Sequence, residues 1–149
     1  MEVEDLIKRY LGQGRAMQIA TMRDDQPWVC TVYYIEDENQ NLYWLSLPDR
    51  RHSREIAKHN KIAVAIPIKV EQPVIGLQAE GVAAIVADVA VISKIMERYT
   101  ERHKVGNDFY NNFLTGKNQH VLYRFIPTNF GLFDEVTFND GVRREWITS

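Results

Sequence analysis

The segment LYWLSLPDRRHSREIAKHNKIAVAI, residues 42–66, decides the fold because its character changes twice. It begins and ends with runs of apolar, aromatic and β-branched residues, which are typical of strands. Pro48 interrupts the first run, and we expect the Asp49 side chain to cap a helix over about residues 51–59. A strand, a short helix and a second strand therefore follow one another in this segment.

Strand patterns dominate the rest of the chain. Helices are expected over residues 3–11, behind a capping Asp88, and at about 108–114. Gly81 is expected to mark a bulge. The polar turn after Ile35 suggests that residues 28–35 and 42–47 pair as an antiparallel hairpin. The alternation of residue types predicts strands at 16–22, 28–35, 42–47, 61–68, 74–87, 120–126, 130–138 and 142–147.

These elements predict a mainly β fold with peripheral helices, of the α+β type. We expect a six- to eight-stranded antiparallel barrel, formed as a single domain over residues 1–149. No repeat, low-complexity tract or linker interrupts the chain.

Composition narrows the function classes. Lys plus Arg total 18 against 20 for Asp plus Glu, a formal charge of −2, which argues against a nucleic-acid-binding barrel. The one cysteine, Cys30, cannot form an intramolecular disulfide, and this fits a reducing compartment. No apolar run has the length of a signal peptide or a membrane span. We therefore expect a cytoplasmic protein with no nucleic-acid or membrane partner.

The predicted strand 28–35 is apolar on both of its faces. In a barrel, one face fills the interior, and the other has to be covered by a helix, a partner subunit or a ligand. The helices are too few to cover every such strand, so we favour a homodimer with a ligand at the interface. The two faces carry Trp28, Cys30, Val32 and Tyr34 on one side, and Val29, Thr31, Tyr33 and Ile35 on the other.

Two arginines and a histidine, Arg50, Arg51 and His52, lie at the predicted start of the helix after residue 49. Free backbone N–H groups and the helix dipole make such a position suitable for a phosphate, and the planar guanidinium fits phosphate oxygens. Without an anion the three cations oppose the dipole. On these residues alone, a solvated basic turn is at least an equal alternative.

Other candidate sites are weaker. His52, Glu55 and His59 share a helical face, but no fourth ligand is nearby, and no metal site is expected. Cys30 lies within an apolar strand, as inert buried thiols do. No Gly-x-Ser-x-Gly elbow or Gly-rich phosphate loop is present.

The order of these features resembles the FMN-binding split-barrel proteins related to pyridoxamine 5'-phosphate oxidase. The resemblance runs over roughly residues 15–126 and rests on an ordered set of segments rather than on one decisive motif. Those segments are PWVCTVYYI, LYWLS, RRHSREIAKHN, KIAVAI and LQAEGVAAIV. It implies a homodimeric split barrel with two FMN molecules at the interface.

The resemblance also implies the residues that contact the cofactor. The family's Ser-Arg-Lys phosphate clamp falls on Arg50, Arg51 and His52, with histidine in place of lysine, so phosphate binding should weaken as pH rises. The remaining implied flavin contacts are Val29, Cys30 and Thr31 on one strand, Leu45 and Ser46 on the next, and Gln78 before the mid-strand glycine. From the C-terminal part of the second subunit, the implied contacts are Phe133, Arg143, Arg144 and, above all, Trp146.

The C-terminus departs from the oxidase itself. It reads NDGVRREWITS, without the histidine of the family's Arg-x-His signature for the substrate phosphate. Oxidation of pyridoxine phosphate is therefore not expected, and the catalytic residues, substrate and electron donor remain open. The first hypothesis is an FMN-dependent oxidoreductase acting on a small organic substrate. The alternatives are a flavin-binding carrier, sensor or electron-transfer protein without turnover, and a split barrel that uses haem or a deazaflavin.

Overall fold

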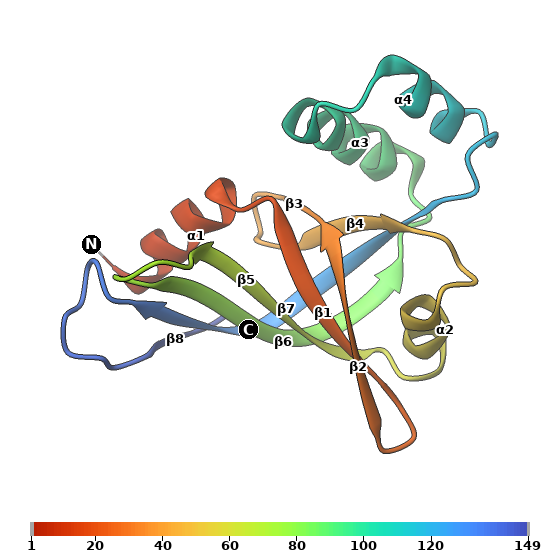
Figure 1. The fold of residues 1–149 in the computed structure, drawn as a ribbon. Coiled ribbons are helices and arrows are strands. Elements are labelled where there is room, and N and C mark those ends of the chain that lie inside the picture. The colour runs from red at the N-terminus through yellow and green to blue at the C-terminus, as the bar shows by residue number, and fades with distance from the viewer. Residues whose placement is uncertain (1, 149) are drawn as a thin grey trace.

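The computed structural model describes residues 2–148, which form one curled antiparallel sheet with helices around it (Figure 1). This confirms the predicted mainly β fold with peripheral helices. The helices are α1 (Val3–Gln13), α2 (Arg51–Lys58), α3 (Val89–His103) and α4 (Asn107–Leu114). The strands are β1 (Ala16–Arg23), β2 (Gln26–Tyr33), β3 (Ile35–Glu36), β4 (Leu42–Ser46), β5 (Lys61–Lys69), β6 (Ile75–Ile85), β7 (Val121–Asp134) and β8 (Arg144–Ile147).

The strand order brings its two ends together along the chain. It runs β2–β1–β5–β6–β7–β4–β3, with β8 paired to β7 outside this path. Only Tyr34 separates β2 from β3 along the chain, so the two ends of the order meet there. The Tyr34 hydroxyl donates a 2.6 Å hydrogen bond to the carbonyl of Leu11 in α1, which fastens this meeting point to the N-terminal helix.

The expected hairpin between residues 28–35 and 42–47 is largely wrong. Strand β2 pairs with β1 along its whole length, and only the two residues of β3 pair with β4. The physical reason is the tight turn before β2, in which Asp24 adopts a left-handed φ of 54°. Such turns favour pairing of the two strands that they join.

The inner face of the sheet holds the main core, in which Trp44, Phe125 and Phe130 are fully buried. Trp44 and Tyr123 stack with ring centroids 5.4 Å apart. Helix α1 adds Leu6, Ile7, Tyr10 and Leu11 to this core, and α2 adds Ile56. The two helices cover opposite ends of the sheet in Figure 1. Helix α2 is thereby held against β1, beside the turn that leads into β2.

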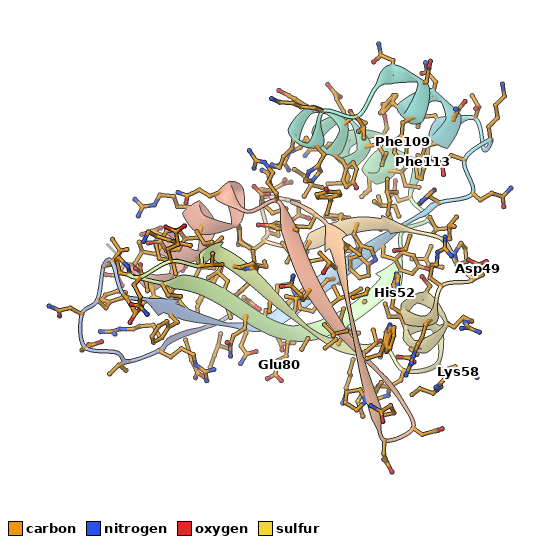
Figure 2. All side chains as sticks on the ribbon, in the orientation of Figure 1. Asp49, His52, Lys58, Glu80, Phe109 and Phe113 are labelled. Atoms are coloured by element: carbon orange, nitrogen blue, oxygen red, sulfur yellow. The ribbon has the colours of Figure 1, made fainter. Side chains whose placement is uncertain are left out.

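Helices α3 and α4 cover the outer face of β4 and project from the sheet (Figure 1). Tyr43 and Leu122 on that face pack against Met96 in a second buried cluster, which Phe109 and Phe113 of α4 extend (Figure 2). The second apolar face of β4 is therefore covered within the chain. Asp88 caps α3 as expected, since its carboxylate accepts hydrogen bonds from the backbone N–H groups of Ala90 and Val91 at 2.9 and 3.3 Å.

Gly81 marks a bulge, as predicted, because the register between β6 and β7 shifts between Glu80 and Gly81. A Cβ on Gly81 would lie within 2.1 Å of the Ile126 carbonyl oxygen, so only glycine fits there. Two separate strands over 120–126 and 130–138 were expected, but β7 is continuous. Its Pro127 lies opposite Gly81 at the irregularity, where a missing N–H is tolerated.

The outer face of β2 meets α3 at one end, where the rings of Tyr33 and His103 lie 5.1 Å apart. Val29 and Tyr33 on this face are each 59% exposed, whereas Tyr34 on the inner face is fully buried. No helix in the described part of the chain has both the length and the apolar character to span a membrane.

Candidate functional site

The first turn of α2 has no side-chain cap. Arg50 is the N-cap residue, with extended φ and ψ of −68° and 151°, and no side chain accepts a hydrogen bond from the helix start. The expected cap, Asp49, lies one residue too early, so its carboxylate does not reach the free N–H groups. Because no acidic residue lies in the first turn, the positive end of the helix dipole is uncompensated by the chain itself.

His52 binds the end of β4. Its Nε2 and the Ser46 hydroxyl share a 2.7 Å hydrogen bond, which holds the imidazole beside the start of α2. Burial and then the charge of Arg50 lower the pKa of His52 below its ordinary value, against an opposing attraction from Glu55. His52 is therefore mainly neutral at pH 7 unless an anion binds next to it.

Arg51 belongs to a buried network. Its Nε donates to Glu55 Oε2 at 2.7 Å, and the Thr21 hydroxyl donates to Glu55 Oε1 at 2.7 Å. Burial raises the pKa of Glu55, but the hydrogen bonds from Thr21 and Arg51 outweigh it and keep the pKa below its ordinary value. The Arg51 guanidinium lies 4.0 Å from the centroid of the Trp28 ring. Its position is thus fixed by β1, β2 and its own helix.

Two buried donors at the start of α2 have no hydrogen-bond partner among residues 2–148. They are the Arg51 Nη2 and the Ser53 hydroxyl, and Ser53 is only 3% exposed. A buried polar group without a partner costs about 1–3 kcal/mol. Both groups lie in the first turn, where the backbone N–H groups are also free. Free donors of this kind at a helix start are suited to an anion.

Thr31 and Gln78 share one row on the outer face of the sheet. The register pairs Thr31 with Gln18, Gln18 with Ala65, and Ala65 with Gln78. The row continues to Gly131 of β7, where an added Cβ would lie 3.2 Å from the Gln78 Cγ and 3.3 Å from the Arg143 Cδ. Val29 lies on the same face, two residues from Thr31. These predicted contacts therefore face a common surface, with Arg143 reaching toward Gln78.

Other predicted contacts lie elsewhere. Cys30 and Trp146 pack against the inner core, and Trp146 stacks on Phe130 at 5.8 Å. Burial raises the pKa of the Cys30 thiol to about 11, so it stays protonated. Leu45 packs beneath α3 and α4. Arg144 forms an ion pair with Asp140, 2.6 Å apart.

Three residues of the α2 site were not predicted in the roles that the structure gives them: Thr21, Trp28 and Glu55. The spacing of Arg51 and Glu55 is i,i+4, which by itself indicates a helical ion pair. The contributions of Thr21 and Trp28 come from strand pairing and could not be read locally. Among residues 2–148, no three His, Cys, Asp or Glu side chains come together as a metal site.

Comparison with known proteins identifies the family. A family model described as pyridoxamine 5'-phosphate oxidase matches residues 3–130, most of the chain. The chain belongs to the pyridoxamine 5'-phosphate oxidase family. The resemblance read from the segments of residues 15–126 is thereby confirmed. No curated protein matches the chain.

Several solved structures share the fold of this family member. A putative pyridoxamine 5'-phosphate oxidase from Listeria innocua is 19% identical, with a TM-score of 0.70 over 88% of this chain and 98% of that one. The haem storage protein HutZ from Vibrio cholerae is 19% identical, with a TM-score of 0.67 over 90% and 95% of the two chains. An FAD-binding protein from Mesorhizobium loti is 17% identical, with a TM-score of 0.62 over 87% and 92%. At these identities, the likeness concerns the fold alone.

Proposed function

We propose that this member of the pyridoxamine 5'-phosphate oxidase family binds FMN, with the phosphate at the start of α2, and acts as an oxidoreductase on a small organic substrate. The observation that carries the proposal is the pair of buried, unpartnered donors on Arg51 and Ser53 beside an uncapped helix start. The phosphate dianion would accept hydrogen bonds from both groups and from the free backbone N–H groups.

Three side chains complete the proposed phosphate site. Arg50 supplies charge at the N-cap position, and Arg51 is already oriented by Glu55 and Trp28. His52 is held by Ser46 and gains a proton when the phosphate approaches, because the anion stabilises the imidazolium. The substitution of the family's lysine by histidine therefore keeps the cation but makes it dependent on pH.

The flavin ring would lie along β2 on the outer face. Strand β2 stands at one end of the strand order, so one edge of its backbone has no strand partner. Residues Val29 to Thr31 can offer backbone N–H and C=O groups there, and Gln78 offers an amide on the same face. A bound flavin supplies hydride and electron transfer, while these residues bind and orient it.

We also propose that the outer face forms a homodimer. Its central positions are small, with Ala20 and Ala63 lining a shallow depression of 510 Å³. Val29, which pairs with Ala20, stands exposed beside it, and Tyr33 stands exposed farther along β2. Small side chains at the centre of a face allow a second copy to approach closely, and the exposed apolar residues around it favour such contact. The substitution Tyr33→Glu should give a monomer in light scattering of the purified protein. A variant that remains dimeric would place the interface elsewhere.

The phosphate assignment is tested by comparing FMN with riboflavin, which lacks the phosphate. Two charge-assisted hydrogen bonds to the phosphate predict binding of FMN about 100-fold tighter than riboflavin. The double variant Arg50→Ala/His52→Ala should remove most of this preference. Arg51 is left unchanged, because its loss would leave the buried Glu55 without its partner and disturb the fold.

The matched control is His59→Ala, which alters an exposed residue just after the end of the same helix. It should leave the preference for FMN unchanged. If the double variant folds and still discriminates FMN from riboflavin as the wild type does, the phosphate lies elsewhere. The absorption spectrum of the purified protein separates flavin from deazaflavin and haem. Turnover with a reduced nicotinamide donor and an acceptor separates an enzyme from a passive binder.

A further inference from the structure

A basic groove lies between α2 and the turn that joins β1 to β2. It has a volume of about 690 Å³, within the range of ligand sites. Its lining includes four cationic side chains, Arg23, Arg51, Arg54 and Lys58, and only two carboxylates, Asp24 and Glu55. This excess of positive charge stands out in a protein whose formal net charge is −2.

Most of the positive charge in the groove is uncompensated. Glu55 is already bound by Arg51 and Thr21, and among the other cations of the groove its charge is felt by Arg23. Within residues 2–148, neither Arg23, Arg54 nor Lys58 has a carboxylate within 4.0 Å. Three free cations therefore face one concave surface, and Asp24 is the only other anion among its lining residues.

The cations form a line that begins at the proposed phosphate site. Arg51, Arg54 and Lys58 follow at i, i+3 and i+7, which places them on one face of α2. At about 1.5 Å of rise per residue, the line extends roughly 10 Å along the helix. Lys58, at the end of this line that lies away from the helix start, is labelled in Figure 2. Arg51 borders both the helix start and the groove, so a ligand can pass directly from one to the other.

We infer that this groove binds the adenylate part of a flavin dinucleotide, so that the chain accepts FAD as well as FMN and binds FAD more tightly. The inference rests on the proposed phosphate site at the start of α2. The flavin-side phosphate occupies that site, and the second phosphate lies along Arg54 and Lys58. Met22 and Ala57 give the groove apolar surface for the nucleoside.

The experiment measures binding of FMN, FAD and ADP to the apoprotein by fluorescence and calorimetry. Two added ion pairs at an exposed surface predict FAD binding about tenfold tighter than FMN at low salt. The double variant Arg54→Gln/Lys58→Gln should abolish that difference and leave FMN binding unchanged. Asp24→Asn should tighten FAD binding a few-fold, since asparagine also accepts the left-handed φ of 54° at this position.

The matched control is Arg9→Gln/Lys117→Gln, which removes one exposed arginine and one exposed lysine far from α2 along the chain. It should leave the preference for FAD intact. Raising the ionic strength should erase the preference in the wild type, because exposed charges are screened. A preference that persists in the Arg54/Lys58 variant, or falls equally in the control, overturns the inference.

The outcomes also separate the inference from the proposed function. Tight FMN binding with no preference for FAD overturns the groove assignment alone. Binding of neither flavin overturns both. ADP carries both phosphates of FAD, so it should compete with FAD and, through its terminal phosphate at the start of α2, also with FMN. If NADPH displaces ADP while FAD does not, the groove serves an electron donor instead of the cofactor, and the assignment to the flavin is wrong.

Discussion

Helix α3 begins at Asp88, whose carboxylate accepts hydrogen bonds from two backbone N–H groups, whereas α2 begins at Arg50, whose side chain accepts none. The last turn of α3 carries Arg102 and His103, which complement its dipole. The first turn of α2 carries cations that oppose the dipole, and two buried donors without partners. The chain itself satisfies the backbone N–H groups at the start of α3. At the start of α2, an anion is needed to do so.

This difference separates the roles of the two helices. Helix α3 covers the outer face of β4 and requires no ligand to do so. Helix α2 contributes only Ile56 to the main core, and Arg51 holds it to the sheet through Glu55 and Thr21. A helix start that is left unsatisfied in the folded chain is where binding energy can be gained. The following predictions test this contrast.

The largest effect on stability is expected from Arg51→Ala. It leaves Glu55, which is 4% exposed, without its charged partner, and it removes the contact with Trp28. Loss of one partner of a buried pair should lower the free energy of unfolding by about 3 kcal/mol. Urea unfolding measures this, and adding Glu55→Gln should restore part of the loss. A change below about 1 kcal/mol would mean that the pair does not anchor α2.

Arg50→Asp gives α2 the kind of cap that α3 has. An aspartate at the N-cap position accepts backbone hydrogen bonds and favours the dipole, so the free energy of unfolding without ligand should rise by about 1 kcal/mol. The same carboxylate repels the phosphate, so FMN binding should weaken by about tenfold. Thermal unfolding and flavin titration on the same sample measure both. A variant that gains stability and keeps its affinity would contradict the proposed phosphate site.

Asp88→Ala makes the converse change at α3. Loss of its cap should lower the free energy of unfolding by about 1 kcal/mol. FMN affinity should stay unchanged, because Asp88 caps a different helix, which follows β6 in the chain and contributes no residue to the α2 site. Weaker flavin binding in this variant would show that the two helix starts are coupled, contrary to their separate roles.

The smallest effect concerns pH. Burial and Arg50 keep the pKa of His52 low in the free protein, and a bound phosphate raises it. The extra affinity is therefore complete below the free-protein pKa and is lost as pH rises through the pKa of the complex. From about pH 5.5 to about pH 8, the wild type should lose a few-fold of its FMN affinity relative to His52→Ala. Dividing the FMN affinity of the wild type by that of His52→Ala cancels the titration of the phosphate itself. A ratio that stays constant with pH would exclude His52 from the site.

Local patterns were sufficient for the faces of the strands but not for their partners. The alternation in residues 28–35 correctly put Tyr34 and Tyr33 on opposite faces, of which the structure buries that of Tyr34. It could not show that β2 pairs with β1, since pairing depends on the turn at Asp24. The two strands predicted over 120–126 and 130–138 are one strand, because the bulge at Gly81 on the neighbouring strand allows Pro127 to lie within it.

The candidate site was predictable to a similar extent. The cationic cluster at the start of α2 is visible in the sequence, and so is the i,i+4 spacing of Arg51 and Glu55. The partners from β1 and β2, Thr21 and Trp28, could not be inferred, because long-range pairing brings them to α2. The sequence also could not show which predicted flavin contacts face one surface. Thr31 and Gln78 do so, whereas Leu45 and Trp146 pack in two separate hydrophobic clusters.

The hydrogen bond from Tyr34 to Leu11 has a practical meaning for protein engineering. Removing the first thirteen residues would also remove the hydrogen-bond acceptor of Tyr34. The junction between β2 and β3, the two ends of the strand order, would then no longer be held by α1. A shortened protein should therefore open along that line and expose interior side chains to a hydrophobic dye. An affinity tag added before residue 2 extends the chain without touching this contact.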